Sequence, residues 1–82
     1  MVKVIYFGRL SDVTGTAEEV LELPDEIDTA GALRNWLDLR FKAEGALLEP
    51  TVRIAVNSEI SFDETPIGGA TEIAFMPPVG GG

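Results

Sequence analysis

The sequence has 82 residues, a net charge of −8, and neither cysteine nor histidine. These features exclude disulfides, thiolate metal sites and an imidazole base, and the negative charge argues against nucleic-acid binding, which depends on neutralising phosphates. A hydrophobic content of 45% suits one small domain with a core. No apolar run approaches the roughly 18 residues of a membrane span, and no signal peptide is recognised. We therefore expect a cytoplasmic protein without a membrane partner.

The first predicted elements are two strands joined by a loop. Residues 2–7 are β-rich and alternate Val2, Val4 and Tyr6 with Lys3, Ile5 and Phe7, so both faces of this strand carry large apolar groups. Residues 8–15 contain glycine, serine, aspartate and threonine, which is typical of a loop. A second strand is predicted over residues 16–23 and ends at Pro24, because proline cannot continue a central ladder.

One amphipathic helix is predicted between Thr29, a plausible N-cap, and Gly45, a natural stop. Its apolar stripe consists of Ala30, Leu33, Leu37 and Phe41, with Trp36 beside it. The opposite side is predicted to face solvent and carries Arg34, Asp38 and Lys42. The spacing of Asp38 and Lys42 allows a weak ion pair.

Three extended segments complete the domain. Residues 52–56 are predicted to be a strand with Arg53 and Ala55 outward, residues 60–62 a brief extended piece, and residues 71–76 the last strand. This order predicts an α+β fold, a mixed sheet of four to five strands with one main helix on one face. If the first and last strands are parallel neighbours, the chain leaves from the middle of the sheet.

The last residues stand apart from the rest of the sequence. After Met76, Pro77 and Pro78 stiffen the backbone, and residues 79–82 are predicted to be a flexible tail on a domain of residues 1–78. Glycines without Cβ atoms can enter a narrow channel, and the distinctive reactive group of the tail is the carboxylate of Gly82. We therefore expect the domain to present this tail to another protein.

The order of elements and the ending Met76-Pro77-Pro78-Val79-Gly80-Gly81-Gly82 resemble the small, sulfur-carrier subunit of molybdopterin synthase. The resemblance covers the whole chain and implies a β-grasp (ubiquitin-like) fold. Gly80 departs mildly from the family pattern, and Ser11-Asp12 stands near the place where the family often carries an Arg-Glu pair.

The resemblance also implies a chemistry for the terminal diglycine, Gly81 and Gly82. An adenylating and sulfurylating enzyme would use ATP to convert the Gly82 carboxylate to an acyl-adenylate and then to a thiocarboxylate. The tail would then donate sulfur to precursor Z inside a large subunit, within an expected heterotetramer. No cofactor or metal is expected on this chain.

The family docks through an apolar surface beside the tail, to which we add Ile5. The residues at matching positions, together with the segment entering the partner, are Phe7, Ile60, Met76, Pro77, Pro78, Val79 and Gly80. Exposed apolar residues of this kind mark an interface. The alternatives for Phe7 and Met76 are ordinary core positions on a two-sided sheet or scattered apolar residues on the surface. The acidic residues, among them Glu18, Glu19 and Asp25, are expected to form a solvated surface.

Three other functions remain open at this stage. The chain could carry sulfur for thiamine, cysteine or tRNA thiolation, or it could be a ubiquitin-like modifier that forms isopeptide bonds through the same diglycine. It could also be a plain interaction domain with an inert tail.

Overall fold

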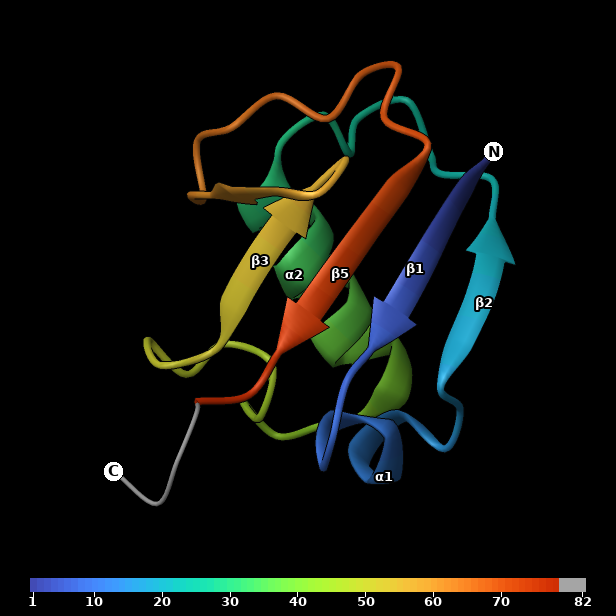
Figure 1. Cartoon of the computed structure of the whole chain (residues 1–82). Helices are drawn as coiled ribbons and strands as arrows, with labels where there is room; N and C mark the ends of the chain where they lie inside the picture. The colour runs from blue at the N-terminus through green and yellow to red at the C-terminus, as the bar shows by residue number, and fades with distance from the viewer. Residues whose placement is uncertain (79–82) are drawn as a thin grey trace.

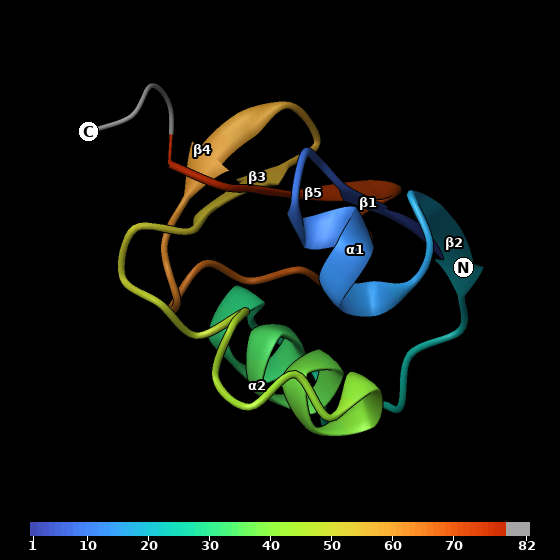
Figure 2. The same cartoon turned by 90° about the horizontal axis from the view of Figure 1, so that it is seen from below.

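A five-stranded mixed sheet forms the frame of the molecule, with strand order β2-β1-β5-β3-β4. The computed structural model describes residues 1–78, and the predicted tail at residues 79–82 lies outside them. The elements are β1 (Val2–Tyr6), α1 (Leu10–Thr14), β2 (Glu18–Leu21), α2 (Ala30–Phe41), β3 (Arg53–Val56), β4 (Glu59–Ser61) and β5 (Glu72–Met76). Helix α2 crosses one face of the sheet, and no other described element covers the opposite face (Figures 1 and 2). The predicted α+β arrangement is confirmed.

The last strand lies in the middle of the sheet, as the sequence predicted. Strand β5 pairs in parallel with β1 and antiparallel with β3, and Figure 1 shows it between them. Both edges of β5 are therefore hydrogen-bonded, which fixes the position and direction of its last residue, Met76. The chain leaves the sheet from a rigid base.

The core lies between the sheet and α2. The inward side chains come from alternate strand positions and from one stripe of the helix, and the largest fully buried ones are Tyr6, Phe75, Leu33, Leu37, Leu47, Ile54, Ile73 and Val4. Tyr6 stacks on Phe75 with ring centroids 6.0 Å apart. Each buried aliphatic or aromatic side chain contributes roughly 1.5–3 kcal/mol through removal from water, so this layer supplies most of the stability.

The prediction of a loop over residues 8–15 was wrong, because residues 10–14 form α1. Leu10 and Thr14, four residues apart, are both buried on the same side of this short helix. Gly15 ends it in the left-handed conformation at φ 79° and donates its N–H to the carbonyl of Ser11. The serine, aspartate and threonine that indicated a loop thus belong to this short helix.

Helix α2 begins as predicted and ends earlier. The Thr29 hydroxyl accepts a hydrogen bond from the N–H of Ala32, which confirms the N-cap. The helix ends at Phe41 because Lys42 adopts the left-handed conformation at φ 54°, so Gly45 is not the stop.

The prediction that Asp38 faces solvent was also wrong. Its residue is only 7% exposed, and its carboxylate accepts hydrogen bonds from the N–H groups of Gly45 (3.0 Å) and Leu47 (3.1 Å). The predicted pair with Lys42 is replaced by these bonds, which fold the segment after α2 back onto the helix. Buried backbone donors require such partners.

Arg34 is mostly buried rather than solvated. Its side chain is 12% exposed, and its guanidinium donates to the carbonyl of Val52 at 2.9 Å. This bond ties the middle of α2 to the start of β3 and holds the segment that leads into that strand.

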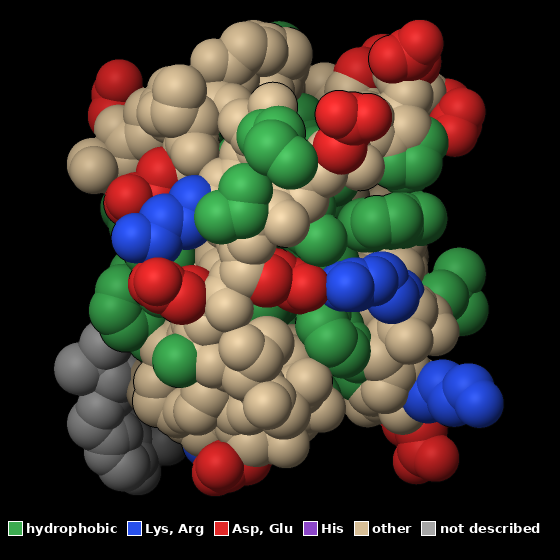
Figure 3. Space-filling model, turned by 90° about the vertical axis from the view of Figure 1, so that its right-hand side faces the viewer, with side chains coloured by type: hydrophobic (Ala, Val, Ile, Leu, Met, Phe, Trp, Pro, Cys, Tyr) green, Lys and Arg blue, Asp and Glu red, His purple; other side chains and the backbone are tan. Residues whose placement is uncertain are grey.

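A polar clamp joins α2 to the β2 edge. The Tyr6 hydroxyl donates to Glu19 at 2.8 Å, and Arg40 donates two hydrogen bonds to the same carboxylate, at 2.9 and 3.0 Å. Figure 3 faces this side and shows acidic and basic side chains in contact among hydrophobic ones. Glu19 was expected to be solvated and is instead a bridging residue.

The clamp shifts the pKa values of its members. Burial, followed by the hydrogen bond and charge of Glu19, raises the pKa of Tyr6 far above its usual value. Burial opposes ionisation of Glu19, but hydrogen bonds from Arg40 and Tyr6 and the charge of Arg40 outweigh it, so the pKa of Glu19 is lowered. Glu19 therefore accepts these bonds as a carboxylate at neutral pH.

Candidate functional site

The candidate site begins where β5 ends and the chain leaves the sheet. The N–H of Phe7 donates to the carbonyl of Phe75 at 3.0 Å, so the two parallel strands stay paired up to this point. Gly8 follows with φ 54°, and a Cβ built there would lie 3.1 Å from Cγ of Pro77. The backbone at Gly8 and the ring of Pro77 thus support each other, and the exit direction is set by both strands.

The open face of the sheet is apolar through its centre. Ile5, Ala74, Ala55 and Ile60 follow one another across four strands, β1, β5, β3 and β4, as the registers place them. The two alanines are 7% and 8% exposed, whereas Ile60 is 56% exposed. This apolar row is open to a partner at its Ile60 end, where an exposed apolar side chain is typical of an interface.

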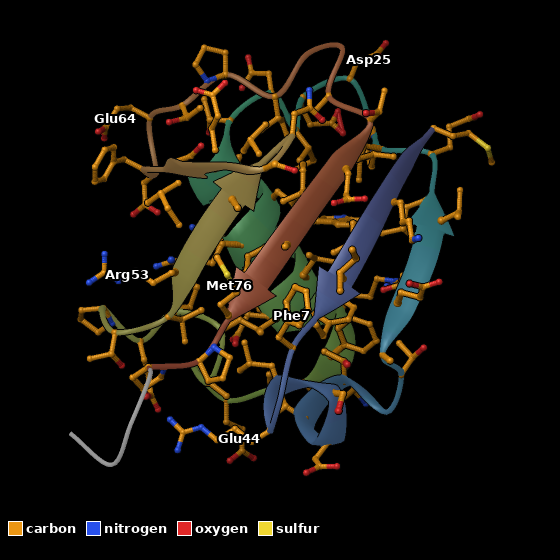
Figure 4. All side chains as sticks on the ribbon, viewed as in Figure 1. Phe7, Asp25, Glu44, Arg53, Glu64 and Met76 are labelled. Atoms are coloured by element: carbon orange, nitrogen blue, oxygen red, sulfur yellow. The ribbon has the colours of Figure 1, made fainter. Side chains whose placement is uncertain are left out.

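The row nearest the exit carries the predicted docking residues Phe7 and Met76. Figure 4 shows these two side chains at the ends of neighbouring strands, on the face opposite α2. Phe7 is 47% exposed and Met76 is partly buried. The alternative reading of Phe7 as an ordinary core residue is therefore wrong.

A groove of about 540 Å³ runs beside the exit on the side of β3 and β4, and its lining includes Arg53, Ile60, Met76, Pro77 and Pro78. The structure thus brings together four of the residues predicted from the sequence. Phe7 lies on the other side of Met76, outside the groove. The remaining predicted residues, Val79, Gly80, Gly81 and Gly82, lie outside the described part of the chain.

Arg53 was predicted to point outward, but its position close to the end of β5, where the chain leaves the sheet, was not predicted. It lies directly opposite Met76 in the register of β3 with β5, and Figure 4 shows it beyond Met76 at the side of the sheet. The pairing of these strands is not visible in the sequence, so the proximity could be found only from the fold.

Among residues 1–78 no group of three or more histidine, cysteine, aspartate or glutamate side chains could hold a metal ion. The Tyr6–Glu19–Arg40 clamp lies on the α2 side of the sheet and its groups are occupied by one another. Likewise, no helix in this part of the chain is long and apolar enough to cross a bilayer. The geometry at the end of β5 fits presentation of the segment that follows it.

The sequence and the fold are similar to those of known proteins. Residues 4–82 match the ThiS family. The molybdopterin synthase sulfur carrier subunit of Escherichia coli is 31% identical over 84 residues, covering 100% of this chain and 100% of that protein.

Two solved structures have the same fold. A Pyrococcus furiosus protein assigned as molybdopterin converting factor subunit 1 gives a TM-score of 0.75 at 26% identity, over 95% of this chain and 97% of that one. SAMP1 from Haloferax volcanii gives a TM-score of 0.79 at 20% identity, over 99% and 98%. The predicted β-grasp fold is confirmed.

Proposed function

The chain belongs to the ThiS family, and on that premise we propose that it is the sulfur carrier subunit of a molybdopterin synthase. The observation that carries the proposal is the family match, which runs over residues 4–82 and so includes the terminal glycines. Two relatives named as molybdopterin synthase sulfur carrier subunits, from Escherichia coli and Haemophilus influenzae, align over 100% of their own length and 100% of this chain.

The chemistry would take place on the carboxylate of Gly82, the last residue of the sequence. A carboxylate is a poor electrophile at neutral pH. On the adenylating enzyme, an oxygen of the carboxylate therefore attacks the α-phosphorus of ATP, pyrophosphate leaves, and the resulting acyl-adenylate has AMP as a good leaving group. Hydrosulfide, or a donor that delivers sulfur at the same oxidation level, then attacks the carbonyl carbon, AMP leaves with the oxygen, and loss of a proton gives a thiocarboxylate. This group donates sulfur to precursor Z in the large subunit of the synthase, with which the chain forms a heterotetramer.

The fold supports this role through rigidity at one end of the tail. Met76 is the last residue of a strand that is paired on both sides, and Pro77 rests against Gly8. The chain can therefore insert its last residues into a partner while the domain docks through Phe7, Met76 and Ile60. Acid, base and metal chemistry are left to the partners.

The proposal is tested by removing the reacting residues. A variant without Gly81 and Gly82 should fail to support molybdopterin formation when mixed with the large subunit, the adenylating enzyme, ATP, a sulfur donor and precursor Z. Addition of an alanine after Gly82, which moves the carboxylate by one residue, should cause the same loss. Each variant is first checked for an unchanged thermal unfolding midpoint. If the truncated chain still yields molybdopterin, the proposal is wrong.

Other measurements on the same variants separate the rival functions. A carrier for another pathway would form the thiocarboxylate but bind a different large partner. A protein modifier would give lysine-linked conjugates that disappear when Gly82 is deleted. A plain interaction domain would be unaffected by the truncation.

A further inference from the structure

Arg53 is an unusual residue for its position on the open face of the sheet. The chain carries 14 acidic and 6 basic residues, and among residues 1–78 Lys3, Arg34 and Arg40 lie in ion pairs. Arg53 has no ion pair within the described chain and is exposed. Arg9 and Lys42 are likewise exposed and outside these ion pairs, so Arg53 is distinguished by its place beside Met76 rather than by its lack of an ion pair.

Arg53 lies at the border between apolar and acidic surroundings, since a second pocket that it lines also includes Asp63 and Glu64. Its cross-strand neighbour is Met76, and it lines the same groove as Ile60 and Pro77. The acidic residues labelled in Figure 4, Asp25, Glu44 and Glu64, lie around the periphery of the view. A charge at the border of an apolar surface contributes to specificity, because docking removes water from it and leaves it unpaired unless the partner supplies an opposite charge.

The chemistry of arginine indicates which negatively charged group on the partner would pair with it. Its planar guanidinium is weakly hydrated and offers paired N–H groups that match the two oxygens of a carboxylate. An extended acidic surface would be repelled by a chain of net charge −8. The complementary surface is therefore an apolar one that carries a single aspartate or glutamate facing Arg53.

We infer that Arg53 determines partner specificity by pairing with one carboxylate on the large subunit, at the edge of the apolar contact made by Ile60 and Met76. The apolar residues supply most of the buried area, and Arg53 sets the register and rejects surfaces without the acid. This inference rests on the proposed function, since it takes the large subunit as the partner. It adds a contact that fixes the orientation of the domain as the tail enters.

The experiment compares charge variants of the full chain in binding to the large subunit from the same host. Dissociation constants are measured by calorimetry at about 50 mM and about 300 mM salt, which bracket strong and weak screening of exposed charges. The variants are Arg53→Lys, Arg53→Gln and Arg53→Glu. The control is Lys42→Glu, which changes the net charge equally at the exposed end of α2.

We expect a graded loss of affinity for the large subunit among the Arg53 variants and no loss for the control. Arg53→Glu should weaken binding about 10- to 100-fold at low salt, Arg53→Gln should weaken it less, and Arg53→Lys least. The Gln variant should also lose part of the salt dependence, while Lys42→Glu should stay within about twofold of the wild type. One acid-to-lysine substitution on the large subunit should restore the affinity of Arg53→Glu, an effect that a purely structural role would not produce.

Three results would overturn the inference. Equal affinities for Arg53→Glu and Lys42→Glu would show that Arg53 does not determine specificity, and the proposed function would be unaffected. Unchanged binding combined with slower adenylation would assign Arg53 to the activating enzyme instead. If the wild-type chain itself does not bind the large subunit, the proposed function fails and the inference fails with it.

Discussion

Replacement of Phe7 by alanine tests the docking surface most directly. A phenylalanine side chain exposes about 200 Å² when free, and the 47% left exposed here amounts to about 90 Å². At about 25 cal/mol per Å² of apolar surface removed from water, complete burial by a partner contributes about 2 kcal/mol. We therefore expect Phe7→Ala to raise the dissociation constant for the large subunit by roughly 30-fold.

The assay is calorimetric titration of the large subunit with the wild-type and variant chains. The matched control is Leu39→Ala, because Leu39 is 78% exposed and belongs to α2, which covers the other face of the sheet. The control should bind as the wild type does. Since the remaining part of Phe7 is covered by its own domain, the unfolding midpoint of each variant is measured as well. A Phe7→Ala chain that is folded and binds within about twofold of the wild type would refute the assignment of Phe7 to the interface.

Three further predictions concern the fold that supports the site. Asp38→Ala leaves two backbone N–H groups without their acceptor and should lower the free energy of unfolding in urea by about 2–4 kcal/mol, whereas Asp25→Ala, at an exposed position, should change it by less than about 0.5 kcal/mol. Gly31→Ala should destabilise by about 1–3 kcal/mol despite the higher helix propensity of alanine, because its Cβ would lie 2.9 Å from Cβ of Asp63; Gly68→Ala, with open space around the position, should be nearly neutral, and thermal unfolding compares the two. Finally, Glu19→Gln should lose less stability than the wild type when the pH is lowered from 6 to 3, as measured by urea midpoints.

The sign of the last prediction follows from the lowered pKa of Glu19 in the folded state. The unfolded chain takes up the proton near the ordinary value of 4.5, before the folded chain does. The stabilisation by the carboxylate is therefore complete above that pH and is lost as the pH falls through the lower folded value. A glutamine cannot titrate and shows no such loss. Parallel acid profiles for the two proteins would contradict the role given to the clamp.

The strands and the main helix could be predicted from local patterns, because alternation and the helical stripe are properties of neighbouring residues. The central place of β5 was also expected, and its register with β1 and β3 bears this out. Helix α1 was missed because its five residues are too few for a periodic signal and carry polar side chains.

The errors at Asp38, Arg34 and Glu19 have a different cause. Each is a charged residue at a predicted surface position that meets a partner outside its own helix or strand, 7 and 9 residues along the chain for Asp38 and 18 for Arg34. A sequence pattern shows that a residue is polar but not whether the fold supplies a buried partner. The position of Arg53 beside Met76 depends on strand pairing in the same way.

The central claim is that the carboxylate of Gly82 carries sulfur. The most direct test is the intact mass of the protein purified from its own host, with the C-terminal peptide sequenced by fragmentation. We predict a fraction in which one oxygen is replaced by one sulfur, located at Gly82, and an increase of this fraction after incubation with the adenylating enzyme, ATP and a sulfur donor. A mass that stays unmodified after that incubation would contradict the account and leave the last residues without a chemical role.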